Sequence, residues 1–204
     1  MSQYETAELK ASYGVGRQIG DQLSRQSFDG LDIATVQQGL ADALQGMEYA
    51  VAPNEITEAF QVISQKMREA DEARAAHVID AGREFLDANA TREGVTVTES
   101  GLQYEVLKKG DGEQVSKENS VKVHYHGTLM DGSVFDSSVE RNDPATFPVT
   151  GVIAGWVEAL QLMVIGDKFK LTIPHELAYG ASGAGSIPPY AVLAFEVEVL
   201  EIVG

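Results

Sequence analysis

The chain has 204 residues, of which 44% are hydrophobic and 23% charged, so it can bury a core and is not disordered by composition. It contains no cysteine, which excludes disulfides, thiolate nucleophiles, zinc–thiolate sites and iron–sulfur clusters. Its net charge of −16 disfavours binding to nucleic acid, which needs clustered Lys and Arg, and binding to anionic membranes.

The first residues, MSQYETAELKASYG, carry acidic and polar side chains. A signal peptide has basic residues there, followed by an apolar run of about 7–15 residues. No stretch of the sequence approaches the roughly 18 apolar residues that span a membrane. We therefore expect no targeting segment, no membrane partner and a cytoplasmic location.

The two halves of the chain differ in composition. Residues 1–94 hold 15 Ala and 5 Val, whereas residues 95–204 hold 8 Ala and 16 Val. Alanine favours helices and β-branched valine favours strands. We predict an all-α segment over 1–94, followed by a β-rich domain over 95–204.

The first half predicts three helices. An apolar stripe from Leu9 to Leu23 forms the first; it contains three glycines that should weaken or kink it, and the turn SFDG ends it. Asp32 is the expected N-cap of a second helix that carries the stripe Ile33–Met47. Pro53-Asn54 marks a stop and a new cap, and the third helix follows over Asn54–Ala90. At 1.5 Å per residue it is about 55 Å long.

Such a helix is too long for a domain of fewer than 100 residues to cover. Its first turns are strongly apolar, with Ile56, Phe60, Ile63 and Met67 on one stripe. A partner chain is the simplest cover, so we favour a homodimer formed by the N-terminal helices. The alternative is a marginal three-helix bundle with a long exposed arm.

In the second half the hydrophobic period changes to two. Alternating runs predict antiparallel strands with one dry and one solvated face. A short amphipathic helix over 153–163 can cover the dry face, which gives an α+β domain in which a sheet wraps on one helix. The dry-face residues include Leu102, Tyr104, Val121, Val123, Tyr125, Phe169, Leu171, Ile173, Leu193, Phe195, Val197 and Val199.

The usual catalytic motifs are missing. The sequence has no GxSxG, P-loop or HExxH, and GVG at 14–16 lacks the preceding strand of a dinucleotide fold. His124 and His126 share one strand face, but no third ligand lies at a useful spacing, so solvated histidines are favoured over a metal site. The glycine-rich segment ELAYGASGAGSIPP fits a flap over a binding site better than a phosphate loop. We expect neither metal nor cofactor.

Aromatic residues are spread over the second half. They include Trp156, the only tryptophan, and Phe135, which is directly followed by Asp136. They are either ordinary core residues or the walls of an apolar cleft with one acid at its rim.

Four motifs in order resemble the FKBP-type peptidyl-prolyl cis-trans isomerases. They are VHYHGTLMDGSVFDSS (123–138), VIAGWVEALQLMVIGDKFKLTIP (152–174), ELAYGASGAGSIPP (176–189) and LAFEVEVLEI (193–202). The helical first half resembles the two-domain bacterial subclass, the macrophage-infectivity-potentiator-like proteins, and in particular its cytoplasmic members of about 22 kDa. In that subclass the N-terminal helices form a homodimer.

The resemblance implies a role for each matching residue. Trp156 would form the floor of a proline pocket, and the Ile153 backbone N–H would bind the ligand carbonyl. Asp136 would lie at the rim, held by the Tyr125 hydroxyl, and the Tyr179 hydroxyl would bond near the mouth. The walls would be Tyr125, Phe135, Phe147, Val152, Ile153 and Phe195, and the flap would contribute Ile187.

The resemblance also implies a function and ligands. The expected activity is prolyl cis–trans isomerisation in unfolded or partly folded proteins, with chaperone-like client binding. The alternative is a dimeric holdase in which isomerase activity is secondary. The pocket of this family also binds the macrolides tacrolimus and rapamycin; where the family often has an aromatic residue, this chain has Ala145.

Overall fold

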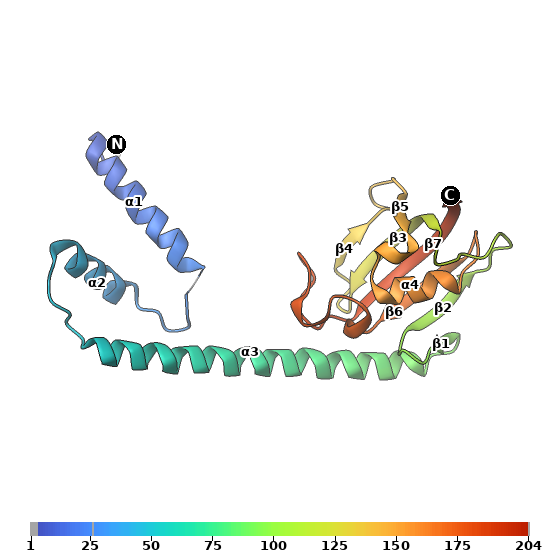
Figure 1. Ribbon diagram of the computed structural model, residues 1–204, viewed down its shortest axis with the longest axis horizontal. Helices are drawn as coiled ribbons and strands as arrows, with labels where there is room; N and C mark the ends of the chain where they lie inside the picture. The colour runs from blue at the N-terminus through green and yellow to red at the C-terminus, as the bar shows by residue number, and fades with distance from the viewer. Residues whose placement is uncertain (1–3, 26, 204) are drawn as a thin grey trace. The chain divides into compact units, whose positions relative to one another are not determined.

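The computed structural model describes residues 4–25 and 27–203 (Figure 1). The first half is helical, as predicted, with α1 (Ala7–Ser24), α2 (Ile33–Gln45) and α3 (Pro53–Ala90). The three glycines do not end α1. Asp32 is the N-cap of α2, as predicted, and its carboxylate accepts the Thr35 N–H at 2.7 Å.

The start of α3 corrects one detail. The helix begins at Pro53 rather than after an Asn54 cap. Proline suits the first helical position because its missing N–H would have no intrahelical partner there. The Ala52 N–H donates to the Glu55 carboxylate at 3.3 Å, and the Ala52 carbonyl accepts from Ile56, so Ala52 caps the helix with its backbone.

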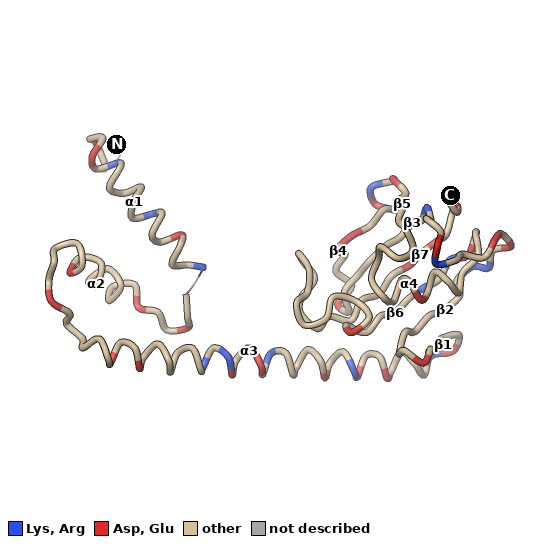
Figure 2. Tube along the Cα trace, in the orientation of Figure 1, with Lys and Arg blue, Asp and Glu red and all other residues tan. Residues whose placement is uncertain are grey.

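The chain divides into two compact units, Met1–Asp71 and Glu72–Gly204. Secondary structure changes from helix to strand at Val95, next to the predicted seam. The contacts between residues, in contrast, place the last turns of α3 in the same compact unit as the sheet. Acidic residues are spread over both units (Figure 2), and none of the described helices is long and apolar enough to cross a membrane.

The second unit is built on one antiparallel sheet, which confirms the predicted α+β class. Its strands run in the order β1-β2-β6-β7-β3-β4, and β5 pairs with the first half of β3. The bounds are β1 Val95–Val97, β2 Gln103–Lys108, β3 Ser120–Leu129, β4 Val134–Ser137, β5 Ala145–Pro148, β6 Lys168–Ile173 and β7 Leu193–Val203. Short 3-10 helices lie at Val149–Gly151 (η1), His175–Leu177 (η2) and Gly180–Ser182 (η3).

The single helix predicted for this domain is α4 (Ala154–Gln161), which lies across one face of the sheet (Figure 1). It buries Trp156, Ala159 and Leu160 against the strands. The dry-face residues Val121, Leu171 and Val197 are fully or almost fully buried, which confirms the predicted alternation.

Two residues of the face predicted to be solvated, Gln103 and Thr172, are buried instead. The last turns of α3 cover them. Asn89 is itself buried, and its amide donates to the Gln103 side-chain oxygen at 2.7 Å and to the Thr172 hydroxyl at 3.3 Å. The Gln103 amide returns a bond to the Leu86 carbonyl at 2.9 Å. A polar network therefore joins α3 to the sheet, and its members satisfy one another as buried polar groups require.

Candidate functional site

A cavity of about 420 Å³ opens beside α4 on the dry side of the sheet. The end of η1 and the N-terminus of α4 form one side, and strands β3, β4, β5 and β7 supply aromatic side chains. Its lining is Tyr125, Phe135, Asp136, Phe147, Gly151, Val152, Ile153, Trp156, Tyr179 and Phe195. A concave, mainly apolar pocket with few polar groups is typical of a small-ligand site.

Trp156 lies at the centre of the aromatic cluster. Its ring meets those of Phe195, Tyr125 and Phe147 in near-perpendicular contacts, with centroid separations of 5.2, 5.5 and 6.1 Å. Such edge-to-face pairs are favourable and fix the ring orientations. The indole N–H is buried and has no acceptor among the described residues.

Two glycines allow this packing. A Cβ on Gly155 would lie 2.5 Å from Cγ2 of Ile173, so only glycine lets α4 approach β6 this closely. A Cβ on Gly127 would lie 2.7 Å from the Phe135 ring and 2.8 Å from the Phe195 ring. Those two rings pack edge to face at 5.4 Å over that strand position.

A polar network occupies the rim. The Tyr125 hydroxyl donates to the Asp136 carboxylate at 2.5 Å. Arg141 forms an ion pair with Asp136 and also donates to the Tyr125 hydroxyl at 3.0 Å. The guanidinium carbon lies 5.8 Å from the centre of the Tyr125 ring. The three side chains therefore hold one another in a single arrangement.

This network changes the pKa values of its members. Partial burial would raise the pKa of Asp136, but the bonds from Tyr125 and Arg141 outweigh it and lower that pKa. Burial and the bond to Asp136 together raise the pKa of the Tyr125 phenol. Near neutral pH the rim thus carries a carboxylate, a guanidinium and a neutral phenol.

Nine of the ten residues predicted for the site line this one cavity. The tenth, Ile187, is buried in the core of the domain and forms a backbone bridge with Ala184 in the segment after η3. Ile153 is the N-cap of α4, where its N–H has no intrahelical acceptor, as its predicted role in binding requires. The functional roles of all ten remain predictions.

Sequence reasoning missed Arg141 and Gly151. Arg141 follows Asp136 by five residues, and the intervening turn brings it back to the rim. Neither the period-two alternation nor the order of the motifs indicates that the chain folds back toward Asp136 at this residue. Gly151 ends η1 and lines the cavity with backbone alone, so no side chain could have indicated it.

The two histidines of β3 lie on the other face of the sheet. His124 and His126 each pair through Nδ1 with a serine hydroxyl, of Ser138 and Ser137 respectively, both at 3.0 Å. Within residues 4–25 and 27–203, no three side chains of the metal-binding types gather.

Comparison with known proteins matches both parts of the chain. Residues 111–200 match the family FKBP-type peptidyl-prolyl cis-trans isomerase, and residues 8–106 match the domain amino terminal to that isomerase. The FKBP-type 22 kDa peptidyl-prolyl cis-trans isomerase of Escherichia coli (strain K12) is 48% identical over 98% of this chain and 97% of the relative. The outer membrane protein MIP of Legionella longbeachae is 35% identical over 97% and 86% of the two chains.

A solved structure is similar over most of the chain. The crystal structure of FkpA from Escherichia coli matches with a TM-score of 0.74 and 32% identity, and covers 98% of both chains. The fold, the aromatic pocket and these relatives lead to one conclusion: the chain belongs to the FKBP-type peptidyl-prolyl cis-trans isomerase family.

Proposed function

We propose that this protein accelerates cis–trans isomerisation of X–Pro bonds in unfolded or partly folded proteins. The observation that carries the proposal is the aromatic cavity of about 420 Å³ with Trp156 at its centre and a fixed carboxylate at its rim. A proline ring is apolar and compact, and it fits between flat aromatic faces.

The reaction breaks no covalent bond. Rotation about the X–Pro bond only removes amide resonance, against a barrier of about 18–20 kcal/mol, and takes about 10–100 s at 25 °C without a catalyst. The planar amide is strongly dipolar, and the twisted amide is less so. A water-poor pocket lined by Trp156, Phe147 and Phe195 therefore stabilises the twisted state relative to the planar one.

Polar groups at the edge orient the bound segment. The Ile153 N–H can donate to a substrate carbonyl, and Tyr179 lies where its hydroxyl can bond near the mouth. The Asp136–Tyr125–Arg141 network holds the walls, so little reorganisation is needed when substrate enters. Lowering the barrier by about 6 kcal/mol would accelerate rotation about 10⁴-fold.

A refolding reaction limited by proline isomerisation tests this function. Catalytic amounts of the full chain should accelerate the slow phase and leave the fast phases unchanged, because only the slow phase depends on X–Pro rotation. A slow phase with the same rate in the presence and absence of the protein would contradict the isomerase proposal.

Tacrolimus and rapamycin are the proposed inhibitors, because they would occupy the same apolar pocket as the proline ring. Ala145 lies in β5 opposite Val123 and packs against the core. Either macrolide should reduce the acceleration of refolding in proportion to the fraction of pockets that it occupies. Titration of the Trp156 fluorescence measures that fraction independently.

Enlarging Gly127 should narrow the pocket without touching the rim. In Gly127→Ala the new methyl group overlaps the far ends of Phe135 and Phe195, and these rings must shift toward the cavity or the core. We expect kcat/KM on an X–Pro peptide to fall about tenfold, which corresponds to about 1.4 kcal/mol. Gly39→Ala, on α2, is the control, because its Cβ position is open and its backbone is helical. Equal activity of the two variants would contradict the close packing inferred here.

We also propose that the chain forms a homodimer through its N-terminal helices. Among their described residues, α1 and α2 bury no side chain, although both carry apolar stripes. A groove of about 780 Å³ between them is lined by Tyr13, Ile19, Leu23, Ile33, Val36 and Leu40, among others. On α3, Phe60 is 61% exposed. A second copy would remove these apolar surfaces from water.

Replacing Leu44 tests the dimer. This α2 side chain is 80% exposed in the single chain, so Leu44→Glu removes almost no contact within one protomer. We expect the wild-type mass in solution to be twice 21.9 kDa and the variant to dissociate at micromolar concentration. Gln45→Glu adds the same charge one residue later and should leave the dimer intact. Equal masses for wild type and Leu44→Glu would contradict this interface, and light scattering after gel filtration measures them.

Client binding by the helices is the second candidate function. The exposed apolar residues that favour a dimer can also hold unfolded chains. If the holdase activity is primary, a variant with strongly reduced isomerase activity such as Asp136→Ala still suppresses aggregation of a denatured client. If isomerisation is primary, that variant loses the effect.

A cytoplasmic location stays a prediction that cell fractionation can test.

A further inference from the structure

The segment that follows pocket residue Tyr179 is closed on itself. The Tyr190 N–H donates to the Gly180 carbonyl at 2.8 Å, and Gly180 is the next residue after Tyr179. Within the loop, Ala184 and Ile187 exchange backbone bonds of 3.0 and 2.8 Å. The position of Tyr179 thus depends on a backbone bond made by a residue 11 positions later.

Tyr190 adopts an unusual backbone conformation. Its φ is +61°, in the left-handed region that residues with a Cβ seldom enter. Glycine would adopt this conformation freely, so the tyrosine side chain must contribute something that offsets the cost. Of the side chain that glycine lacks, the ring is the part with a described contact.

The Tyr190 ring packs against His175. The two rings are nearly perpendicular, at 86°, with centroids 5.3 Å apart. His175 begins η2 directly after Pro174 at the end of β6, so the rigid sheet fixes its backbone. Its Nε2 lies 3.3 Å from the Glu176 carboxylate, and its Nδ1 is buried without a partner among the described residues.

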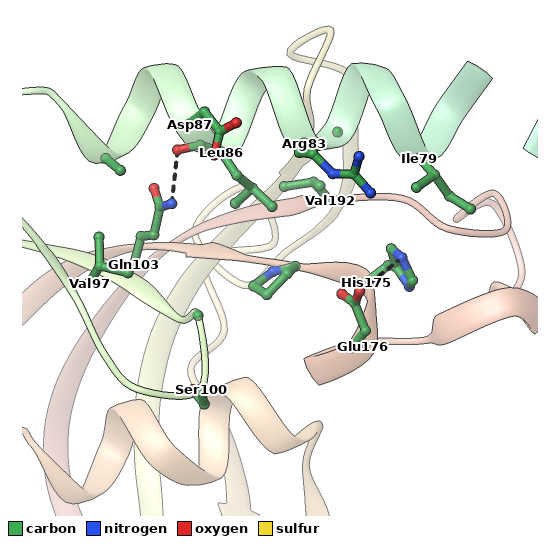
Figure 3. A pocket seen from close by; sticks show the side chains of 14 residues that line it. Ile79, Arg83, Leu86, Asp87, Val97, Ser100, Gln103, His175, Glu176 and Val192 are labelled. Atoms are coloured by element: carbon green, nitrogen blue, oxygen red, sulfur yellow. Dashed lines mark hydrogen bonds and ion pairs between the residues drawn. The ribbon is translucent and has the colours of Figure 1, made fainter. Parts of the chain in front are cut away.

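His175 also lines a second cavity, of about 520 Å³, between α3 and the sheet. Figure 3 shows His175 and Glu176 on one side of it and the α3 residues Ile79 and Arg83 on the other. Val192, two residues after Tyr190, closes the wall, and a Cβ on Gly82 would lie 3.0 Å from it. The loop end that carries Tyr190 is therefore held against α3 as well as against His175.

We infer that His175 and Tyr190 are positioning residues for Tyr179 in the isomerase reaction. The inference rests on the proposed function. Tyr179 is 39% exposed, so its own side chain gives it little fixation at the pocket mouth. The contact between the two rings holds Tyr190 in its left-handed conformation. The hydrogen bond from the Tyr190 N–H then fixes the Gly180 carbonyl, and with it the backbone of Tyr179. The Tyr179 hydroxyl is thereby kept where it can contact the substrate.

The test compares Tyr190→Gly with Tyr190→Phe in the full chain. Glycine permits the left-handed conformation but no longer holds it, because the ring that contacts His175 is gone; phenylalanine keeps that ring. We expect Tyr190→Gly to raise KM for an X–Pro tetrapeptide about fivefold with less than a twofold change in kcat, because Tyr179 acts in binding. Tyr190→Phe should match wild type, and His175→Ala should resemble Tyr190→Gly. NMR exchange measurements on one peptide give both constants.

A double-mutant cycle shows whether the effect passes through Tyr179. In a Tyr179→Phe background the hydroxyl is already absent, so Tyr190→Gly should raise KM no further. Unchanged KM in Tyr190→Gly, a Tyr190→Phe variant as impaired as Tyr190→Gly, or additive effects in the cycle would each overturn the inference. An inactive wild-type protein would instead overturn the proposed function, so the two failures are distinguishable.

Discussion

Asp136→Ala is expected to lower kcat/KM for X–Pro isomerisation about 10- to 100-fold, since hydrogen bonds to charged groups contribute about 1.5–3 kcal/mol each. The substitution removes the acceptor of the Tyr125 hydroxyl and the partner of Arg141, so both lose their fixed positions at the rim. Peptide assays on the purified full chain measure the loss.

Asp143→Ala is the matched control. It removes an exposed acid from the same loop and leaves the network intact, so its activity should equal that of wild type. If the two variants lose activity equally, the effect comes from net charge near the pocket rather than from the Asp136 network.

The pH dependence of the rim follows from the same bonds. Because the folded-state pKa of Asp136 lies below its unfolded value, the stabilisation from its charged form is fully present above the ordinary pKa of about 3.9. It is lost as pH falls through the lowered value. Tyr125→Phe deletes one bond to the carboxylate and should raise the pKa of Asp136. Carboxyl NMR titration measures the change, and an unchanged or lowered pKa would contradict the assignment.

Gly155→Ala is expected to lower the free energy of unfolding of the catalytic unit by about 2 kcal/mol, within the usual range for overpacking. The new methyl group would lie 2.5 Å from Cγ2 of Ile173, a fully buried, β-branched residue that cannot rotate away. The better helix propensity of alanine, about 1 kcal/mol, recovers only part of the loss. Activity should fall too, because α4 carries Trp156.

Urea unfolding measures the stability of Gly155→Ala and of the control Ala154→Val. The comparison separates the effect of the contact with Ile173 from the effect of a larger side chain in α4. Ala154 is exposed at the start of the same helix, so its enlargement should change stability by less than about 0.5 kcal/mol. In an Ile173→Ala background, where Cγ2 is absent, Gly155→Ala should become nearly neutral. Additive losses would show that the contact with Ile173 is not the cause.

The sequence predicted most of the architecture because local rules determine it. Asp32 caps α2 as its residue type requires, and the alternation around Val121 and Val197 identifies the buried face. The pocket residues were found through a resemblance of ordered motifs, since periodicity alone cannot separate a wall such as Phe135 from an ordinary core residue.

The failures arise where a distant segment changes the surroundings. The alternation of apolar and polar residues predicts that Gln103 and Thr172 face solvent. It cannot show that the end of α3, with Asn89 14 residues before Gln103, covers them. Arg141 lies at the rim because the turn after β4, in which the Arg141 N–H donates to the Ser137 carbonyl, folds back toward Asp136, and no residue pattern predicts that geometry.

The bonds of Asn89 to the sheet determine where the isomerase unit can be cut. A fragment that begins at residue 95 starts where helix changes to strand. It would lack the end of α3, so the buried side chains of Gln103 and Thr172 would lose their hydrogen-bond partners and become exposed to solvent. A fragment that begins at Glu72 keeps this cover. For expression, crystallisation or inhibitor screening, the shorter piece should be the poorer reagent, although it contains every residue of the aromatic pocket.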